Sequence, residues 1–137
     1  MTTSGTRLAV ARELLAALER GMTGEGLRRY FHPDAIQVEH FSPVTPTGRT
    51  RGLDAMLAAS VAGAELLSAQ RYRVTSAVEV DDLVVLQLEW TGTLARPLGA
   101  HPIGHELRAD VAMFLRFDPA GLIIRQESYD CYPPMAA

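Results

Sequence analysis

Four long extended runs in the second half of the sequence constrain the fold more than any other feature. The runs at 70–80, 83–94, 107–117 and 122–132 are rich in β-branched and aromatic residues. An Asp-Asp pair, a long loop and the sequence DPAG separate them, and no helical pattern intervenes. Consecutive strands without a helix between them pair antiparallel, so this half predicts a meander of long strands.

The first half of the sequence predicts helices. Apolar residues recur at helical spacing over 6–20 and from Thr50 toward Leu66, and a shorter helix fits 24–31. Thr6 and Thr50 are suited to cap the longer helices. The expected apolar stripes are Leu8, Ala11, Leu14, Leu15 and Leu18 in the first helix, Leu27, Tyr30 and Phe31 in the short one, and Leu53, Met56, Leu57 and Val61 in the third. Helices followed by strands predict the α+β class, with the helices packed on an antiparallel sheet.

The last two runs form a hairpin whose register can be predicted. If DPAG closes on Phe117 and Leu122, then Ala109 pairs with Asp130, Val111 with Ser128, and Met113 with Gln126. The face expected inside carries Ala109, Val111, Met113, Leu115 and Phe117 together with Leu122, Ile124, Gln126, Ser128 and Asp130. Burying hydroxyl, amide and carboxylate groups is costly unless they are paired. This polar end of an apolar face therefore favours a pocket.

Composition narrows the function classes. The chain has 137 residues, 47% of them hydrophobic, which suits one domain spanning 1–137 rather than two. A net charge of -3 without a basic stripe argues against nucleic acid. No apolar run approaches the ~20 residues of a membrane span and no signal pattern is visible, so we expect a cytoplasmic protein that does not bind a membrane. The only cysteine, Cys131, is expected to be a small strand residue.

An acid and a base stand side by side at the end of the stretch AIQVEHF, which predicts a strand at 35–40 before a loop at 41–49. Because strand side chains alternate, Gln37 and Glu39 share one face, and His40 lies on the other. Periodicity alone would turn the apolar side of this strand to the core and Glu39 to water. His40 is then either a functional residue or a hydrogen-bonded packing residue.

The order of helices and strands, with the motifs YFHPDA and TPTGRT, resembles the nuclear transport factor 2-like superfamily. The segment Trp90 to Arg108, WTGTLARPLGAHPIGHELR, is similar to a segment of SnoaL-type polyketide cyclases. The residues that match are Gly92, Thr93, Pro97, Leu98, Pro102 and Gly104, while Leu94, Ile103 and His105 depart from the family pattern. The resemblance implies a cone, in which a strongly curved sheet wraps against the helices and encloses a pocket.

The resemblance also implies two acid/base residues. Ketosteroid isomerase, another member of the superfamily, has a general-base carboxylate on its first strand, and counting from Asp34 places it at Glu39. SnoaL-type cyclases have an acid/base aspartate on the last strand, which fits Asp130. The histidine of the cyclases has no counterpart here, and Met113 stands where the isomerase has its oxyanion-hole aspartate. Neither of these mechanisms transfers intact.

These observations predict a cofactor-independent enzyme that moves protons on a largely apolar carbonyl-bearing molecule: a cyclase, isomerase, hydratase or lyase. Glu39 and Asp130 would be the acid/base pair. The residues expected to bind substrate are Gln37, Gln126 and Ser128, which would orient an oxygen, the wall residues Tyr72, Trp90, Val111 and Met113, and the neighbouring His40. No metal or nucleotide site is predicted. The charged outer face of the sheet suggests a homodimer. The alternative is a non-catalytic ligand-binding or assembly module of the same fold.

Overall fold

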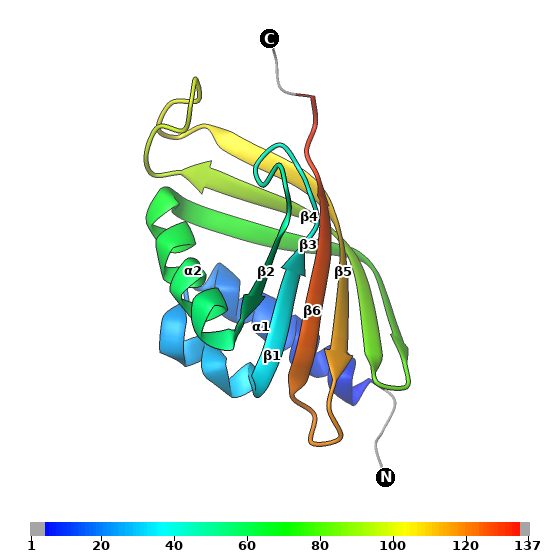
Figure 1. The fold of residues 1–137 in the computed structure, drawn as a ribbon. Helices are drawn as coiled ribbons and strands as arrows, with labels where there is room; N and C mark the ends of the chain where they lie inside the picture. The colour runs from blue at the N-terminus through cyan, green and yellow to red at the C-terminus, as the bar shows by residue number, and fades with distance from the viewer. Residues whose placement is uncertain (1–4, 135–137) are drawn as a thin grey trace.

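The computed structural model describes residues 5–134, in which the helices gather against one curved sheet (Figure 1). In chain order the elements are α1 (Thr6–Glu19), the 3-10 helix η1 (Gly24–Tyr30), β1 (Phe31–Glu39), β2 (Arg49–Gly52), α2 (Leu53–Leu66), β3 (Leu67–Val80), β4 (Leu83–Leu94), β5 (Glu106–Phe117) and β6 (Ile123–Cys131). Helix α1 packs on β3 and β4, and α2 packs on η1 and β1. The predicted α+β class is confirmed.

The sheet has the strand order β2-β1-β6-β5-β4-β3. The predicted meander of β3 to β6 is confirmed, but the sheet is mixed, because β1 joins β6 in parallel. The short strand β2 takes the last residue of the expected loop and the expected start of the third helix, and it pairs antiparallel with β1. Gly48 makes the connecting turn with a φ of 67°, and a Cβ there would lie 2.8 Å from the Glu39 carbonyl oxygen. Four residues, RTRG, are too few and too polar to show strand periodicity.

The predicted register of the last hairpin is wrong by two residues. Val111 pairs with Asp130 and Met113 with Ser128, because Phe117 pairs with Ile123 and an irregularity follows at Arg116. A shift by an even number keeps every side chain beyond it on its own face. Near the turn the odd step changes the face, so Ile123 is fully buried, where Leu122 and Ile124 were expected inside.

The helices start slightly differently from the prediction. Gly5 precedes α1 and Gly52 precedes α2, so Thr6 is the first helical residue and Thr50 lies in β2. Val61 is 44% exposed, because α2 buries only the stripe of its first turns. No helix within 5–134 is long and apolar enough to cross a membrane.

The core fills the end of the molecule near the β5–β6 turn. Leu86, Leu115 and Ile123 are fully buried there, against Leu14 of α1 and Phe31 at the start of β1. Farther along the same inner face the helices no longer fill the space. The candidate site lies where the inner face of the sheet is no longer covered by packed helices.

Candidate active site

A cavity of about 350 Å³ lies on the inner face of the sheet, beyond the part of that face that the core covers. Strands β1, β3, β4, β5 and β6 contribute to its wall, and the end of α2 and the β1–β2 and β4–β5 loops complete it. The predicted site residues that line it are Gln37, Glu39, Tyr72, Trp90, Val111, Met113, Gln126, Ser128 and Asp130. His40 is not among its lining residues.

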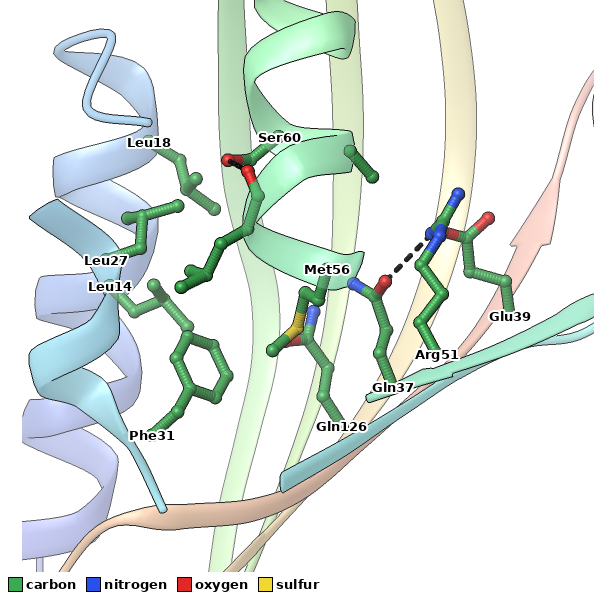
Figure 2. A pocket seen from close by; sticks show the side chains of 12 residues that line it. Leu14, Leu18, Leu27, Phe31, Gln37, Glu39, Arg51, Met56, Ser60 and Gln126 are labelled. Atoms are coloured by element: carbon green, nitrogen blue, oxygen red, sulfur yellow. Dashed lines mark hydrogen bonds and ion pairs between the residues drawn. The ribbon is translucent and has the colours of Figure 1, made fainter. Parts of the chain in front are cut away.

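A smaller chamber of about 210 Å³ adjoins the cavity on the helix side (Figure 2). Its lining is mostly apolar and comes from α1, η1, β1 and α2: Leu14, Leu18, Leu27, Phe31, Met56 and Leu57. Gln37, Glu39 and Gln126 line both spaces. The two chambers therefore share one polar wall.

The strand pairings assemble this shared wall. Gln37 on β1 stands between Arg51 on β2 and Gln126 on β6. One step along, Glu39 stands between Arg49 and Ser128. Residues paired across neighbouring strands present their side chains on the same face. The parallel pairing of β1 with β6, which the sequence did not predict, thus brings the first and last strands to one site.

Glu39 is held in an ion pair. Its Oε1 lies 2.6 Å from Nη1 of Arg51, which also donates to Oε1 of Gln37 at 2.9 Å (Figure 2). Arg49 lies farther away, with its Nε 3.9 Å from Oε2. The side chains of Arg51 and Glu39 are only 16% and 24% exposed. The sequence analysis missed Arg51, because Thr50 was expected to cap a helix and no strand was predicted at 49–52.

Asp130 is a carboxylic acid in the cavity whose proton affinity is raised. Burial raises the pKa of its carboxyl above the ordinary range, and the negative charge of Glu39 raises it further. The neighbouring Ser128 hydroxyl acts in the opposite direction on this pKa. Two carboxylates on one cavity therefore have different environments, an ion pair for Glu39 and an apolar wall for Asp130.

Tyr132 is a pocket residue that the sequence reading missed. It lines the larger cavity, and burial together with the charges of Asp130 and Glu39 raises the pKa of its phenol to about 12. No hydrogen bond joins its hydroxyl to another residue within 5–134. The signal was its position two residues after Asp130, which gives both side chains the same face of an extended chain. Tyr132 is thus a neutral O–H donor facing the cavity.

The aromatic wall is fixed by one amide. Oε1 of Gln70 accepts hydrogen bonds from the Tyr72 hydroxyl at 3.1 Å and from Nε1 of Trp90 at 3.0 Å, while Nε2 of Gln70 donates to the Leu18 carbonyl. Tyr72 and Trp90 stand directly opposite each other on β3 and β4. Burial raises the pKa of Tyr72, so this hydroxyl also stays neutral. The Tyr72 hydroxyl already donates its hydrogen to Gln70, so Tyr72 forms part of the cavity wall and does not donate to a ligand.

Gly92 leaves the space that the Trp90 ring fills. A Cβ at Gly92 would lie 2.6 Å from Cζ2 of Trp90. We expect Gly92→Ala to displace the ring and to cost about 1–3 kcal/mol of unfolding free energy through overpacking. Trp90 is the only tryptophan, so its fluorescence emission reports the change directly. Gly63→Ala is the control, since nothing lies within 4 Å of a Cβ there. Equal emission spectra for Gly92→Ala and the wild type would contradict this account of the wall.

His40 faces away from both chambers. Its Nε2 lies 2.6 Å from Oε2 of Glu127, and its ring stacks on Tyr129 with centroids 3.9 Å apart. The hydrogen bond from His40 keeps the pKa of the Glu127 carboxyl below its usual range. Of the two readings of His40, the hydrogen-bonded packing residue fits this placement. His40, Glu127 and Tyr129 lie together on the outer face of the sheet, where a homodimer was predicted to form. The homodimer stays a prediction.

Two further histidines, His101 and His105, lie in the β4–β5 loop, where His101 pairs with Leu98. His101 and His105 stack on each other in the β4–β5 loop, with ring centroids 4.1 Å apart. Leu98 of the same loop lines the cavity. Within 5–134, no three His, Cys, Asp or Glu side chains are grouped so that they could hold a metal ion.

Comparisons with known proteins agree with this architecture. AclR from Streptomyces galilaeus, provisionally assigned as a hydroxylase, is similar with a TM-score of 0.79 and 20% identity over 96% of this chain and 83% of its own. IdmH from Streptomyces antibioticus, provisionally assigned as a polyketide cyclase, has a TM-score of 0.74 and 20% sequence identity, and the match covers 90% of this chain and 91% of IdmH. A protein from Jannaschia sp. CCS1, provisionally assigned as a SnoaL-like polyketide cyclase, has a TM-score of 0.73 and 16% sequence identity, and the match covers 95% of this chain and 90% of that protein. No curated protein matches the sequence.

Helices packed against one face of a curved six-stranded sheet, with a cavity between them, define the nuclear transport factor 2-like fold. The model of the SnoaL-like domain matches residues 11–126. The chain therefore belongs to the SnoaL-like domain family. The expectation of a cone around a pocket is confirmed, and the structural neighbours, at these identities, establish the fold alone.

Proposed function

We propose that this protein is a cofactor-independent enzyme that transfers protons on a largely apolar, carbonyl-bearing molecule. Asp130 carries the proposal: its carboxyl lines the cavity, and burial raises its pKa toward the range in which a carboxylic acid can both take and return a proton. A carbonyl α-proton is the substrate hydrogen that one positioned carboxylate can remove when the resulting enolate is stabilised.

The proposed step begins with Asp130 ionised. Its carboxylate takes a proton from the carbon next to a substrate carbonyl, and the electron pair of the broken C–H bond moves onto the carbonyl oxygen as an enolate. If a C=C bond follows the α-carbon, the enolate is a dienolate, and protonated Asp130 returns the proton to its γ-carbon. The double bond then moves into conjugation with the re-formed carbonyl, which gives an isomerase. In a cyclase the enolate carbon instead attacks a second carbonyl of the same molecule, and Asp130 returns its proton to the new alkoxide.

The enolate needs hydrogen-bond donors, and the cavity offers two kinds. The Tyr132 hydroxyl lines the same cavity as Asp130 and has no partner within 5–134. The amides of Gln37 and Gln126 lie on the shared wall. Glu39 supports the reaction through its charge, which increases the proton affinity of Asp130, while Arg51 pairs with Glu39. Tyr72, Trp90, Val111 and Met113 provide apolar walls that exclude water.

The neighbours support the substrate class. Two of the similar structures carry provisional assignments as polyketide cyclases. A polyketide is a mostly apolar molecule with repeated carbonyl groups, which matches an apolar cavity with a few polar side chains on one wall.

A ligand-binding module is the second candidate, and the ion pair of Glu39 with Arg51 favours it. A paired carboxylate is already satisfied and needs no role in proton transfer. The two candidates differ in one outcome, because a binding module takes up carbonyl compounds without accelerating the loss of their α-protons.

The test is hydrogen–deuterium exchange at the α-carbon of a panel of apolar ketones and diketones in D₂O, followed by proton NMR. Exchange that depends on the protein supports the enzyme. Binding of panel members without any exchange above the protein-free rate would favour the binding module.

We expect His40→Ala to leave this exchange rate unchanged, because the imidazole lies on the outer face of the sheet. The loss of its hydrogen bond to Glu127 should lower the unfolding free energy by about 1 kcal/mol, measured by urea denaturation. A loss of exchange as large as that caused by removing Asp130 would contradict the assignment of the site to the inner face.

A further inference from the structure

We infer that Arg51, which lines the smaller chamber beside the shared wall, binds a carboxylate, so that the substrate is a keto acid with an apolar body. Arg51 would hold the acid group while the ketone lies toward Asp130. The inference deepens the proposed function by naming a substrate class, and it rests on that proposal only for the role of the ketone.

Free hydrogen-bond donors line the smaller chamber beside the shared wall. Nη1 of Arg51 is committed to Glu39 and Gln37, but its Nε and Nη2 make no hydrogen bond within 5–134. Neither nitrogen is sealed in the protein, since the only such unpartnered buried atom described is Nε of Arg7. The Oε1 of Gln37 already accepts from Arg51, so its free amide nitrogen can only donate. What these groups lack is a ligand that accepts.

A carboxylate fits this requirement better than a neutral carbonyl. It has two acceptor oxygens and matches the planar fork of a guanidinium, and such charge-assisted pairs are about twice as strong as neutral ones. Arg49 lies 3.9 Å from the second oxygen of Glu39 and offsets part of the charge that would repel an acid. Asp130 lines only the larger cavity, so an acid group held by Arg51 in the smaller chamber stays away from the Asp130 carboxyl.

The position of the wall then fixes the kind of molecule. Apolar side chains line the smaller chamber beside Arg51, and the aromatic wall lies across the larger one. A ligand whose carboxylate is held by Arg51 in the smaller chamber would extend past the shared wall, with its ketone toward Asp130 and its apolar body against Tyr72 and Trp90. The simplest such ligand is a chain with a carboxylate and a ketone separated by a few carbons.

The test compares 4-oxo-4-phenylbutanoate with its primary amide, which has nearly the same shape and no charge. Calorimetry should show that the wild type binds the acid about ten times more tightly than the amide, since a charge-assisted pair adds roughly 1.4 kcal/mol. In the double variant Glu39→Gln with Arg51→Gln, which replaces the ion pair by neutral groups, the two ligands should bind equally. Arg71→Gln removes the same charge from an exposed outer position and should keep the preference.

Equal affinities in the wild type, no binding of the acid, or an unchanged preference in the double variant would each overturn the inference. Should the double variant not fold, Arg51→Lys keeps the charge without the fork and should reduce the preference without abolishing it. Deuterium exchange separates this inference from the proposed function. Preference for the acid without any deuterium exchange would support the carboxylate site and contradict the proposed enzyme. Deuterium exchange without a preference for the acid would support the enzyme and contradict the carboxylate site.

Discussion

Asp130→Asn is expected to lower the rate of α-proton exchange by about 10²–10⁴-fold, the usual contribution of a positioned general base. The amide keeps the shape of the side chain but cannot accept a proton at neutral pH. Ligand affinity should change little, because apolar walls provide most of the contact. The measurement is deuterium uptake by NMR at saturating ligand, with affinity measured separately by calorimetry.

Stability supplies the control for this variant. The folded-state pKa of Asp130 is raised, so the native protein binds this proton more tightly than the unfolded chain does, and ionisation above that pKa weakens the native state. Asp130→Asn should therefore be at least as stable as the wild type at pH 8, and any advantage should shrink toward acid pH. Full exchange activity in a folded Asp130→Asn protein would remove Asp130 from the mechanism.

Arg51→Met is expected to lower the unfolding free energy by about 2 kcal/mol. The methionine fills most of the space of the arginine stem but leaves the half-buried Glu39 carboxylate with only the distant Arg49. Breaking a fully buried pair costs about 3–5 kcal/mol, and the partial exposure of both side chains reduces that value here. Urea denaturation monitored by circular dichroism gives the difference.

The double variant Glu39→Gln with Arg51→Met shows whether the unpaired charge is the cause. Because the carboxylate is gone, at least half of the lost stability should return. A double variant that is as unstable as Arg51→Met would mean that the arginine matters through packing instead.

Most of the fold could be predicted because strong periodicity carried it. The long strands and the two α-helices have apolar patterns over many residues, and their bounds differ from the predicted ones by a few residues. The features that were not predicted are either too short to show a pattern or join segments that lie far apart in the chain. Strand β2 is too short for a pattern, and the irregularity near Phe117 moved the hairpin by two residues. The parallel pairing of β1 with β6 joins segments that no local pattern connects.

The site could be predicted in part for the same physical reason. Strand alternation placed Gln126, Ser128 and Asp130 on one face, and the even register error left them there. The assignment of Glu39 to the cavity came from the family resemblance, since periodicity alone would have exposed it. Arg51 was missed because it lies in the unpredicted strand, and Tyr132 because only the first part of the run at 122–132 was assigned to the inner face, although strand alternation gives Tyr132 the face of Asp130.

The central claim, that Asp130 is a cavity carboxyl with raised proton affinity, can be tested without any substrate. Carbon-13 NMR of the labelled aspartate Cγ follows the titration of Asp130, identified by its absence in Asp130→Asn. We predict a midpoint above the ordinary aspartate value of about 3.9 and a lower midpoint in Glu39→Gln, because that change removes a neighbouring negative charge. A midpoint at or below the ordinary value, unaffected by Glu39→Gln, would contradict the account.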